Sequence, residues 1–195
     1  MISAAIICLN EEKLIARCIY NVMWADEVVI IDGGSLDRTK DIIRDSFFND
    51  KKVRWYNNTF RRHFGDQKNL AISMCKGDWI FVLDADETIE DGLVEELKSI
   101  ATEKNEYDAV NIPRKNFIDG MITDAYPDYQ SRFFRNFCRY IYPVHEELVG
   151  WRKTCYTEHH ILHYKSNDRF NDQQRYYRKI ISEMGNKFRR PHENW

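Results

Sequence analysis

The stretch that decides the fold is Trp79-Ile80-Phe81-Val82-Leu83-Asp84-Ala85-Asp86-Glu87, an apolar run that ends in acidic residues. An uninterrupted apolar run of this length predicts a strand that is buried on both faces of a sheet. Because strand side chains alternate, Asp84 and Asp86 point to the same side. The carboxyl end of a central strand is where open α/β sheets bind their ligands. Such a pair suits Mg²⁺ or Mn²⁺, which takes carboxylate oxygens and keeps sites open for phosphate.

The same residues also fit a purely structural interpretation. If the strand runs directly into a helix, Asp86 or Glu87 lies near the positive end of the helix dipole, where an acidic side chain is stabilising. The Asp-x-Asp spacing by itself does not separate a metal site from such a junction. The rest of the chain has to decide between them.

Composition narrows the class of protein. A length of 195 residues with 43% hydrophobic residues suits one globular domain, and the net charge of -2 gives no broad field that favours nucleic acid. Five cysteines, an odd number without a Cys-x-x-Cys pair, favour a reducing compartment. The apolar residues 1–9 are too short for a membrane span and are followed at once by charged residues. We therefore expect a soluble, cytoplasmic protein, with any membrane contact peripheral.

Strands and helices alternate in the first half of the chain. Strands are predicted at residues 2–9, 27–32 and 53–56. Helices are expected at residues 10–22, through Ile43 with Ser35 or Asp37 as the cap, and through Met74 with Asp66 as the cap. This order implies a parallel sheet with right-handed crossovers. We therefore predict an α/β domain with a Rossmann-like sheet flanked by helices.

Beyond Asp86 the pattern becomes mixed. A helix is predicted at residues 90–100, strands at 107–113 and 161–164, and a hairpin turn at Asp119-Gly120. In the polar and aromatic stretch 126–135, alternation places Asp128, Gln130 and Arg132 on one face. That row can bind a hydroxyl-rich or charged ligand, but the residues alone favour the solvated face of an antiparallel strand.

The end of the chain predicts a helix over residues 169–188. One apolar stripe runs along it, formed by Phe170, Tyr177, Ile181, Met184 and Phe188. We expect this stripe to pack on the domain, with a peripheral membrane contact as the less favoured alternative. The chain then divides into a domain at residues 1–165 and a helical extension at 166–195.

Four pieces in a fixed order give the sequence a family resemblance. They are an apolar strand ending in Asn10-Glu11-Glu12, the run Val28-Val29-Ile30-Ile31-Asp32-Gly33-Gly34-Ser35-Leu36-Asp37-Arg38-Thr39, Gln67-Lys68-Asn69-Leu70-Ala71, and Gly77-Asp78-Trp79-Ile80-Phe81-Val82-Leu83-Asp84-Ala85-Asp86-Glu87. Together they resemble the family 2 glycosyltransferases of the GT-A fold. Residues 126–135 and Val144-His145-Glu146 are similar to the branch of lipopolysaccharide-core glucosyltransferases. The resemblance covers residues 2–165.

The resemblance implies a metal-dependent, inverting transfer of a sugar from a nucleotide donor, most often UDP-linked, to an unidentified glycan, lipid or protein acceptor. Asp86 would bind Mn²⁺ or Mg²⁺ directly, and Asp84 would contact the ribose or the metal through water. Asp32 would accept a hydrogen bond from the uracil ring. The donor-binding residues implied in this way are Leu9, Asn10, Glu11, Asp32, Lys68, Asp84 and Ala85. For Lys68, a solvated helix lysine is the alternative.

The late histidines and carboxylates supply the remaining candidates. By resemblance, His163 is the candidate third metal ligand; a structural histidine on an apolar strand is the alternative, and His159 and His160 are weaker competitors. Inversion needs a base for the proton of the acceptor. Glu146 is the first candidate and Asp128 the second. Glu146 could instead be a structural carboxylate that orients its neighbouring histidine.

Two other functions compete with the transferase. A nucleotidyltransferase also uses strand-end carboxylates and a metal, but the first strand is followed by Asn10-Glu11-Glu12 and not by a glycine-rich basic loop. A module of the same fold that binds a sugar nucleotide or a glycan without turnover is the second rival, and the intact Asp84 and Asp86 argue against it. The chain ends at Trp195, soon after the last predicted helix, so we expect a compact catalytic core.

Overall fold

The computed structural model describes residues 1–47, 49–102 and 106–184. The elements of the first half are β1 (Ile2–Cys8), α1 (Ile15–Val22), β2 (Glu27–Asp32), α2 (Thr39–Phe47), β3 (Val53–Asn57), α3 (Phe64–Met74), β4 (Trp79–Asp84), β5 (Glu87–Ile89) and α4 (Leu93–Thr102). Those of the second half are β6 (Ala109–Ile118), β7 (Met121–Ile122), β8 (Asp128–Arg135), β9 (Arg139–Ile141), β10 (Glu147–Val149), β11 (Thr154–Tyr156), β12 (Ile161–Lys165) and α5 (Asn167–Met184).

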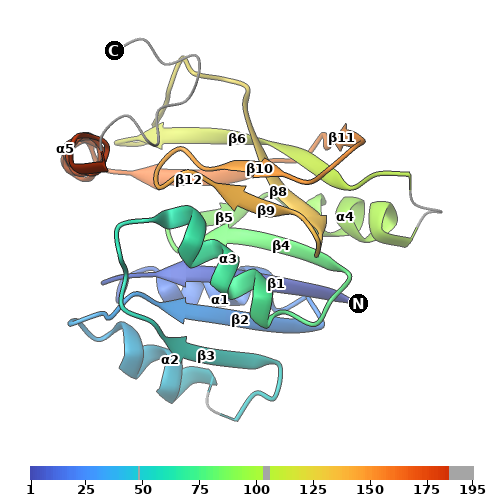
Figure 1. The fold of residues 1–195 in the computed structure, drawn as a ribbon, viewed down its shortest axis with the longest axis horizontal. Helices are drawn as coiled ribbons and strands as arrows, with labels where there is room; N and C mark the ends of the chain where they lie inside the picture. Colours follow the sequence, from blue (N-terminus) through green and yellow to red (C-terminus); the bar gives the residue numbers. More distant parts are fainter. Residues whose placement is uncertain (48, 103–105, 185–195) are drawn as a thin grey trace.

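One large mixed sheet forms the centre of the molecule (Figure 1). Its strands lie in the order β3-β2-β1-β4-β8-β6-β12-β5. The first four strands of this order are parallel, whereas β8 is antiparallel to both β4 and β6. The expected α/β class is therefore confirmed. Strands β2 and β4 lie on opposite sides of β1, and the reversal of strand order there opens a crevice at the carboxyl ends of β1 and β4.

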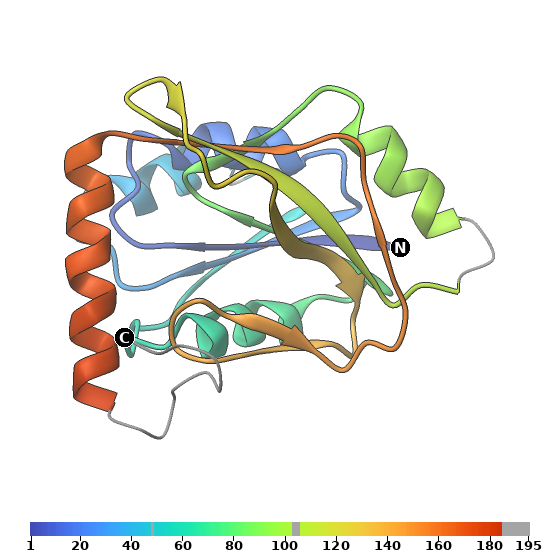
Figure 2. The same cartoon turned by 90° about the horizontal axis from the view of Figure 1, so that it is seen from above.

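Helices cover both faces of the sheet. Helices α1, α2 and α4 share one hydrophobic cluster with alternate sheet residues such as Ile6 and Phe81. Helix α3 and the β9–β10 hairpin share a second cluster on the other face, with residues such as Val82 and Phe134. In Figure 2 the two layers lie on opposite sides of the sheet. Because β4 is buried on both faces, as its apolar sequence predicts, its last residues are held rigidly at the edge of the crevice.

Several local signals behave as the sequence predicts, and one does not. Asp37 accepts hydrogen bonds from the backbone and hydroxyl of Thr39 at the start of α2, so it is the predicted cap. Asp119 and Gly120 form the turn between β6 and β7, both with positive φ. The prediction that Asp66 caps α3 is wrong, because the side chain of His63 accepts the hydrogen bond from the backbone of Asp66.

Three boundaries or faces also differ from the sequence interpretation. Helix α1 begins at Ile15 and not at Asn10, whose φ of 57° turns the chain after β1. Helix α4 begins at Leu93 and not at Glu90, because a turn with Gly92 at a φ of 93° follows the short strand β5, which pairs with β12. The predicted solvated face of β8 is wrong for Arg132, which is 4% exposed.

Helix α5 lies across the end of the sheet where β1, β2 and β4 finish (Figure 2). Its Tyr177 ring packs edge-on against Phe64 and against His145. Ile180 is its buried side chain, while Phe170, Tyr177, Ile181 and Met184 are half-buried. The predicted stripe member Phe188 lies outside the described residues. Within the described part of the chain, we find no helix with the length and apolarity needed to span a bilayer.

Candidate functional site

A cavity of about 730 Å³ opens at the carboxyl ends of the parallel strands, under α5. Six residues predicted to bind the donor or the metal line it: Leu9, Asn10, Glu11, Asp84, Ala85 and Asp86. Helix α5 contributes Arg169, Asp172, Gln173, Tyr176 and Tyr177 to the same lining. The volume lies in the range of pockets that hold drug-sized ligands. We call this space the donor cavity.

The loops after β1 and β2 shape the floor of the donor cavity by binding each other. Asn10 accepts a hydrogen bond from the backbone of Leu36 through Oδ1, and its own backbone donates to Ser35 Oγ. Gly33 lies between these loops, where a Cβ atom would come within 3.0 Å of Phe60 and 3.3 Å of the Cys8 carbonyl. A side chain at position 33 would therefore fill space that the cavity needs.

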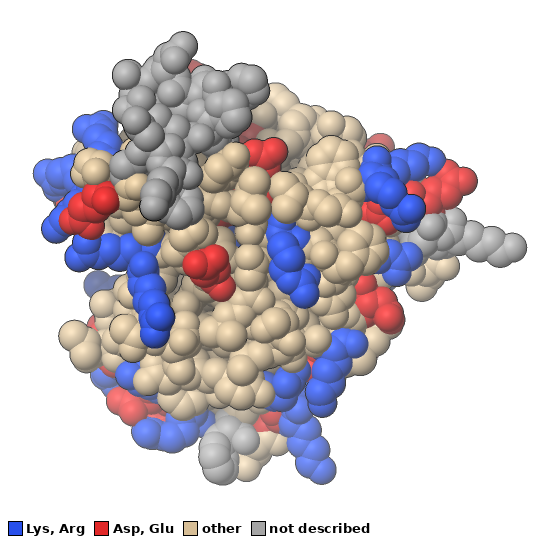
Figure 3. Space-filling model, in the orientation of Figure 1, with Lys and Arg blue, Asp and Glu red and all other residues tan. Residues whose placement is uncertain are grey.

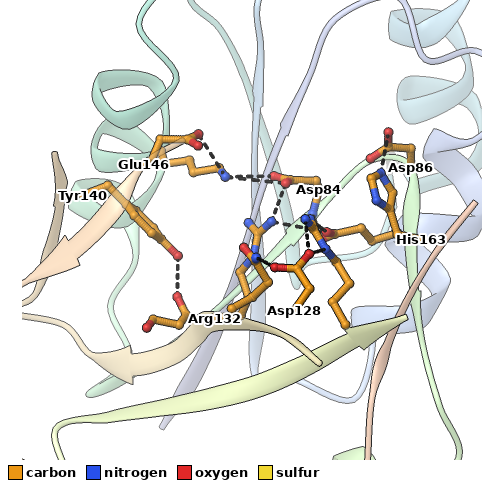
Figure 4. Close-up of polar contacts among 12 residues, drawn as sticks. Asp84, Asp86, Asp128, Arg132, Tyr140, Glu146 and His163 are labelled. Carbon is orange, nitrogen blue, oxygen red and sulfur yellow. Dashed lines mark hydrogen bonds and ion pairs between the residues drawn. The ribbon is translucent and has the colours of Figure 1, made fainter. Parts of the chain in front are cut away.

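Asp86 and His163 meet at the edge of the donor cavity (Figure 4). His163 Nε2 lies 3.2 Å from Asp86 Oδ2, and both side chains are 11% exposed. Lys165 and Arg169 lie 3.4 and 3.7 Å from the same oxygen. Burial raises the pKa of Asp86, but the hydrogen bond and charge of His163, with the charge of Lys165, outweigh it and hold that pKa below its usual value.

Hydrogen bonds fix which nitrogen of His163 faces Asp86. Asn116 donates its Nδ2 to Asp128 Oδ2 at 2.8 Å, so its Oδ1, 2.7 Å from His163 Nδ1, is the acceptor of that contact. Nδ1 is therefore the donor, and Nε2, which hydrogen-bonds Asp86 when it carries a proton, presents a lone pair to a cation once that proton is released. A cation placed between two such groups satisfies both.

The residues present fit a divalent cation at this point. Two ligands that hold one ion at about 2.1 Å and at right angles are about 3 Å apart, close to the separation of His163 Nε2 and Asp86 Oδ2. Across residues 1–47, 49–102 and 106–184, no group of three His, Cys, Asp or Glu side chains converges for a metal ion. The remaining ligands would have to come from a bound diphosphate and water.

Asp84 lines the donor cavity, while its ion-pair partners Lys68 and Arg132 line a second cavity of about 700 Å³. Lys68 Nζ is 3.2 Å from Asp84 and 3.1 Å from Glu146, and it lines the second cavity together with Glu146. Lys68 is 4% exposed, so the alternative of a solvated helix lysine is wrong. The two predicted sites are thus joined through one buried lysine.

Asp84 also forms an ion pair with a buried arginine (Figure 4). Arg132 Nη2 lies 2.6 Å from Asp84 and 3.2 Å from Glu87, and Arg114 bridges Glu87 at 2.8 Å and Asp128 at 2.7 Å. Burial raises the pKa of Asp84, yet the charges of Arg132 and Lys68 outweigh burial and hold that pKa well below its usual value. Asp84 is therefore an ionised acceptor in a fixed position.

The two base candidates differ in their surroundings. Asp128 accepts from Arg114 and Asn116 through Oδ2 and from Gln130 through Oδ1. Burial raises its pKa, but these partners lower it below the ordinary value. Glu146 has a contact to Lys68 and is 15% exposed. Both carboxylates line the second cavity.

Two predicted donor residues have partners that the sequence did not indicate. Glu11 is paired with Arg169 of α5, and burial, partly offset by that arginine, raises the pKa of Glu11 to about 7. Asp32 is fully buried behind Gly33, and its Oδ1 accepts from the backbones of Gly34 and Ser35 at 2.6 Å. Its Oδ2 is buried with no hydrogen-bond partner in the described part of the chain. Asp32 therefore organises the β2 loop beside the cavity and does not line it.

The sequence interpretation missed Glu87, Arg114, Arg132 and Arg169 as parts of the site. The sequence placed Arg132 in the polar row of β8 but gave no indication that its side chain is buried. The two competing histidines pair elsewhere: His159 with Glu96 and His160 with Glu90, away from Asp86. On the face seen in Figure 3, basic and acidic side chains are interspersed, without a broad basic area.

Comparison with known proteins places this geometry in a family. The family model described as Glycosyl transferase family 2 matches residues 3–185 of this chain. The lipopolysaccharide core biosynthesis glycosyltransferase LpsC of Rhizobium meliloti is 32% identical over 119 residues, which are 61% of this chain and 44% of LpsC. The chain thus spans less than half the length of this curated relative.

Solved structures agree on the fold. S. aureus TarS 1-349 in complex with UDP-GlcNAc has a TM-score of 0.64 at 16% identity, over 85% of this chain and 58% of that one. The mannosyltransferase PcManGT from Pyrobaculum calidifontis, in complex with GDP-Man and Mn2+, has a TM-score of 0.50 at 23% identity, over 58% of this chain and 35% of that one. The GT-A fold expected from the sequence is confirmed, and the chain belongs to glycosyltransferase family 2.

Proposed function

We propose that this chain transfers a sugar from a nucleotide-sugar, with UDP-sugars as the first choice, to a hydroxyl of a glycan, lipid or protein acceptor, with inversion at the anomeric carbon. The observation that carries the proposal is the position of Asp84 and Asp86 on one wall of the 730 Å³ donor cavity, at the carboxyl end of buried β4. The complexes of TarS with UDP-GlcNAc and of PcManGT with GDP-Man support a nucleotide-sugar donor. We also propose that the protein acts in the cytoplasm.

In this proposal the donor enters the cavity with its nucleotide against the loops after β1 and β2. Leu9, Asn10 and Glu11 line the cavity there, and Asp32 acts from behind Gly33. The sugar end then points toward Asp84, whose partners Lys68 and Arg132 line the second cavity. Arg169 is ion-paired with both Glu11 and Asp86. An incoming diphosphate can therefore replace these carboxylates as the partner of its guanidinium.

Asp86 and His163 would hold a divalent cation, Mn²⁺ or Mg²⁺. When bound, such an ion supplies a Lewis acid that stabilises the charge developing on the departing diphosphate. The chain prepares this position by fixing His163 through Asn116 and by keeping Asp86 ionised in a buried setting. The Mn2+ in the PcManGT complex supports the choice of ion.

Transfer requires the acceptor oxygen to attack the anomeric carbon from the side opposite the diphosphate. The new carbon–oxygen bond forms as the bond to the diphosphate breaks, and the acceptor proton passes to a carboxylate. We assign this base to Glu146, because both oxygens of Asp128 already accept hydrogen bonds. Lys68 then acts as a positioning residue, since it holds Glu146 next to Asp84.

Calorimetric titration with UDP, GDP and their common sugar conjugates, with and without Mn²⁺, tests the proposal. Metal-dependent binding of one nucleotide is expected. If no nucleotide binds in the presence of either Mn²⁺ or Mg²⁺, the chain does not use the donor cavity as proposed.

A further inference from the structure

The second cavity is bordered by an unbroken series of ion pairs. Its members alternate between carboxylate and cation, in the order Glu146, Lys68, Asp84, Arg132, Glu87, Arg114 and Asp128. We call this series the charge chain; Figure 4 shows its course around Asp84. Both of its ends, Glu146 and Asp128, are carboxylates that line the second cavity.

Each cation of the charge chain lies between two carboxylates. Lys68 contacts Asp84 and Glu146, Arg132 contacts Asp84 and Glu87, and Arg114 contacts Glu87 and Asp128. Among the described residues that line the second cavity, Lys68, Arg114 and Arg132 are the only Lys or Arg residues. A phosphate or carboxylate on a ligand must therefore compete with two protein carboxylates for every cation it meets, which disfavours anionic ligands.

Hydrogen-bond donors without a partner remain in the same place. Arg132 Nε and Nη1 are buried and have no hydrogen-bond partner in the described part of the chain. These nitrogens are donors, and a hydroxyl oxygen is an acceptor that brings no charge. Gln130 and Gln174 add amide groups to the lining. The cavity therefore suits a ligand with several hydroxyls.

Two aromatic side chains give the cavity an apolar rim. Tyr129 and Trp151 line it and are 50% and 44% exposed. Trp151 donates its indole N–H to the Leu148 carbonyl at 2.8 Å, and Tyr129 packs edge-on against Tyr156. Both rings are thus held in place with surface open to a ligand. A rigid aromatic ring is a low-cost contact for the C–H faces of a sugar ring or similar polyol.

We propose that the second cavity binds an uncharged, hydroxyl-rich group of the acceptor, such as a neutral sugar unit, and discriminates against units that carry a phosphate or carboxylate. The inference rests on the proposed transferase function, because it makes this cavity the acceptor side of the reaction. It adds the chemical class of the group that receives the sugar.

The test uses matched pairs of saccharides in ligand-observed NMR titrations with the purified chain. Each pair consists of a neutral mono- or oligosaccharide and the same compound with one phosphate or uronic acid group. In at least one pair the neutral member should bind at least about tenfold more tightly than its charged partner. Trp151→Ala should weaken that binding about tenfold, whereas Trp55→Ala, on a strand remote from the cavity, should not change it.

Glu146→Gln provides a second test, because it leaves Lys68 with one carboxylate instead of two. The charged member of the pair should gain affinity in this variant, and the neutral member should change little. Charged members that bind as tightly as neutral ones, or an absence of binding throughout the panel, would overturn the inference. UDP titrations with Mn²⁺ on the same sample separate this result from the proposed function, because donor binding depends on Asp86 and not on the second cavity.

Discussion

His163 Nε2 faces Asp86 Oδ2 at 3.2 Å, although the two residues are 77 positions apart in the sequence. The hydrogen bond between His163 Nδ1 and Asn116 fixes the ring so that Nε2 is the atom presented to Asp86. The segment after β4 thus places a carboxylate oxygen, and β12 an imidazole nitrogen, at the point where the proposed metal ion would bind. The first prediction follows from this pair.

His163→Ala should weaken UDP binding in Mn²⁺ by about 10- to 100-fold, the usual effect of disturbing a metal site. Binding in EDTA should stay close to that of the unchanged protein, because the loss acts through the ion. Calorimetry under both conditions measures the difference. Tyr164→Phe, at the neighbouring exposed position, is the matched control. Equal losses with and without metal would mean that His163 contacts the nucleotide or supports the fold instead.

Glu146→Gln should keep donor affinity within about threefold and lower the rate of transfer by about 100-fold or more, as expected for loss of a general base. Release of the nucleotide in the presence of acceptor gives the rate. Asp128→Asn is the comparison, and it should retain more of the rate because Asp128 is fully engaged by Arg114, Asn116 and Gln130. A slow Asp128→Asn beside a normal Glu146→Gln would exchange the two assignments.

Arg132→Met should lower the free energy of unfolding by about 3–5 kcal/mol, because it leaves Asp84 and Glu87 in a buried site without their shared cation. Urea unfolding followed by circular dichroism gives the value. Arg44→Met, an exposed residue of α2, should leave the midpoint unchanged. If both variants unfold at the same urea concentration, the charge chain contributes nothing to stability.

Glu27 makes stability depend on pH. It accepts from Ser3 Oγ at 2.6 Å and from Arg54 and the backbone of Lys76; burial raises its pKa, but these bonds outweigh burial and lower it below 4.5. A lowered pKa means that this stabilisation is present above the unfolded pKa and is lost as the pH falls through the folded value. Glu27→Gln should therefore cost about 1–3 kcal/mol at pH 7.

The deficit of Glu27→Gln relative to the unchanged protein should shrink as the pH falls below about 4, near the ordinary pKa of a glutamic acid. Urea titrations at several pH values follow it. Glu95→Gln, exposed on α4, is the control and should show no such trend. A deficit that is constant from pH 7 to pH 3 would mean that the ionised form of Glu27 is not what stabilises the fold.

The parallel half of the fold was accessible from sequence because its signals are local. The apolar run of β4, the alternation of strands and helices and the cap at Asp37 each depend on neighbours within a few residues. Strand β5 was not accessible in the same way. Its three residues are strand only because they pair with β12, more than 70 positions later. For Glu87, which is fully buried, the sequence offered only a position near a helix start, as part of the structural alternative.

The residues of the site differ in the same way in whether local sequence predicts them. Asp84 and Asp86 could be identified because they end a conspicuous strand, and the structure brings both to the donor cavity. Arg132 lay in a polar row that sequence reasoning assigned to solvent, because nothing nearby in the chain indicates its partners Asp84 and Glu87. Contacts between distant segments, such as Arg169 of α5 with Glu11, likewise appear only in the folded chain.

The most direct test of the donor site is calorimetric titration of UDP into the unchanged protein and into Asp86→Ala, each with saturating Mn²⁺ and with EDTA, and with Asp45→Asn as an exposed control. The account predicts that Mn²⁺ strengthens binding to the unchanged protein and to Asp45→Asn, and that Asp86→Ala loses this gain while remaining folded. Equal UDP affinity of Asp86→Ala and the unchanged protein in saturating Mn²⁺ would contradict it.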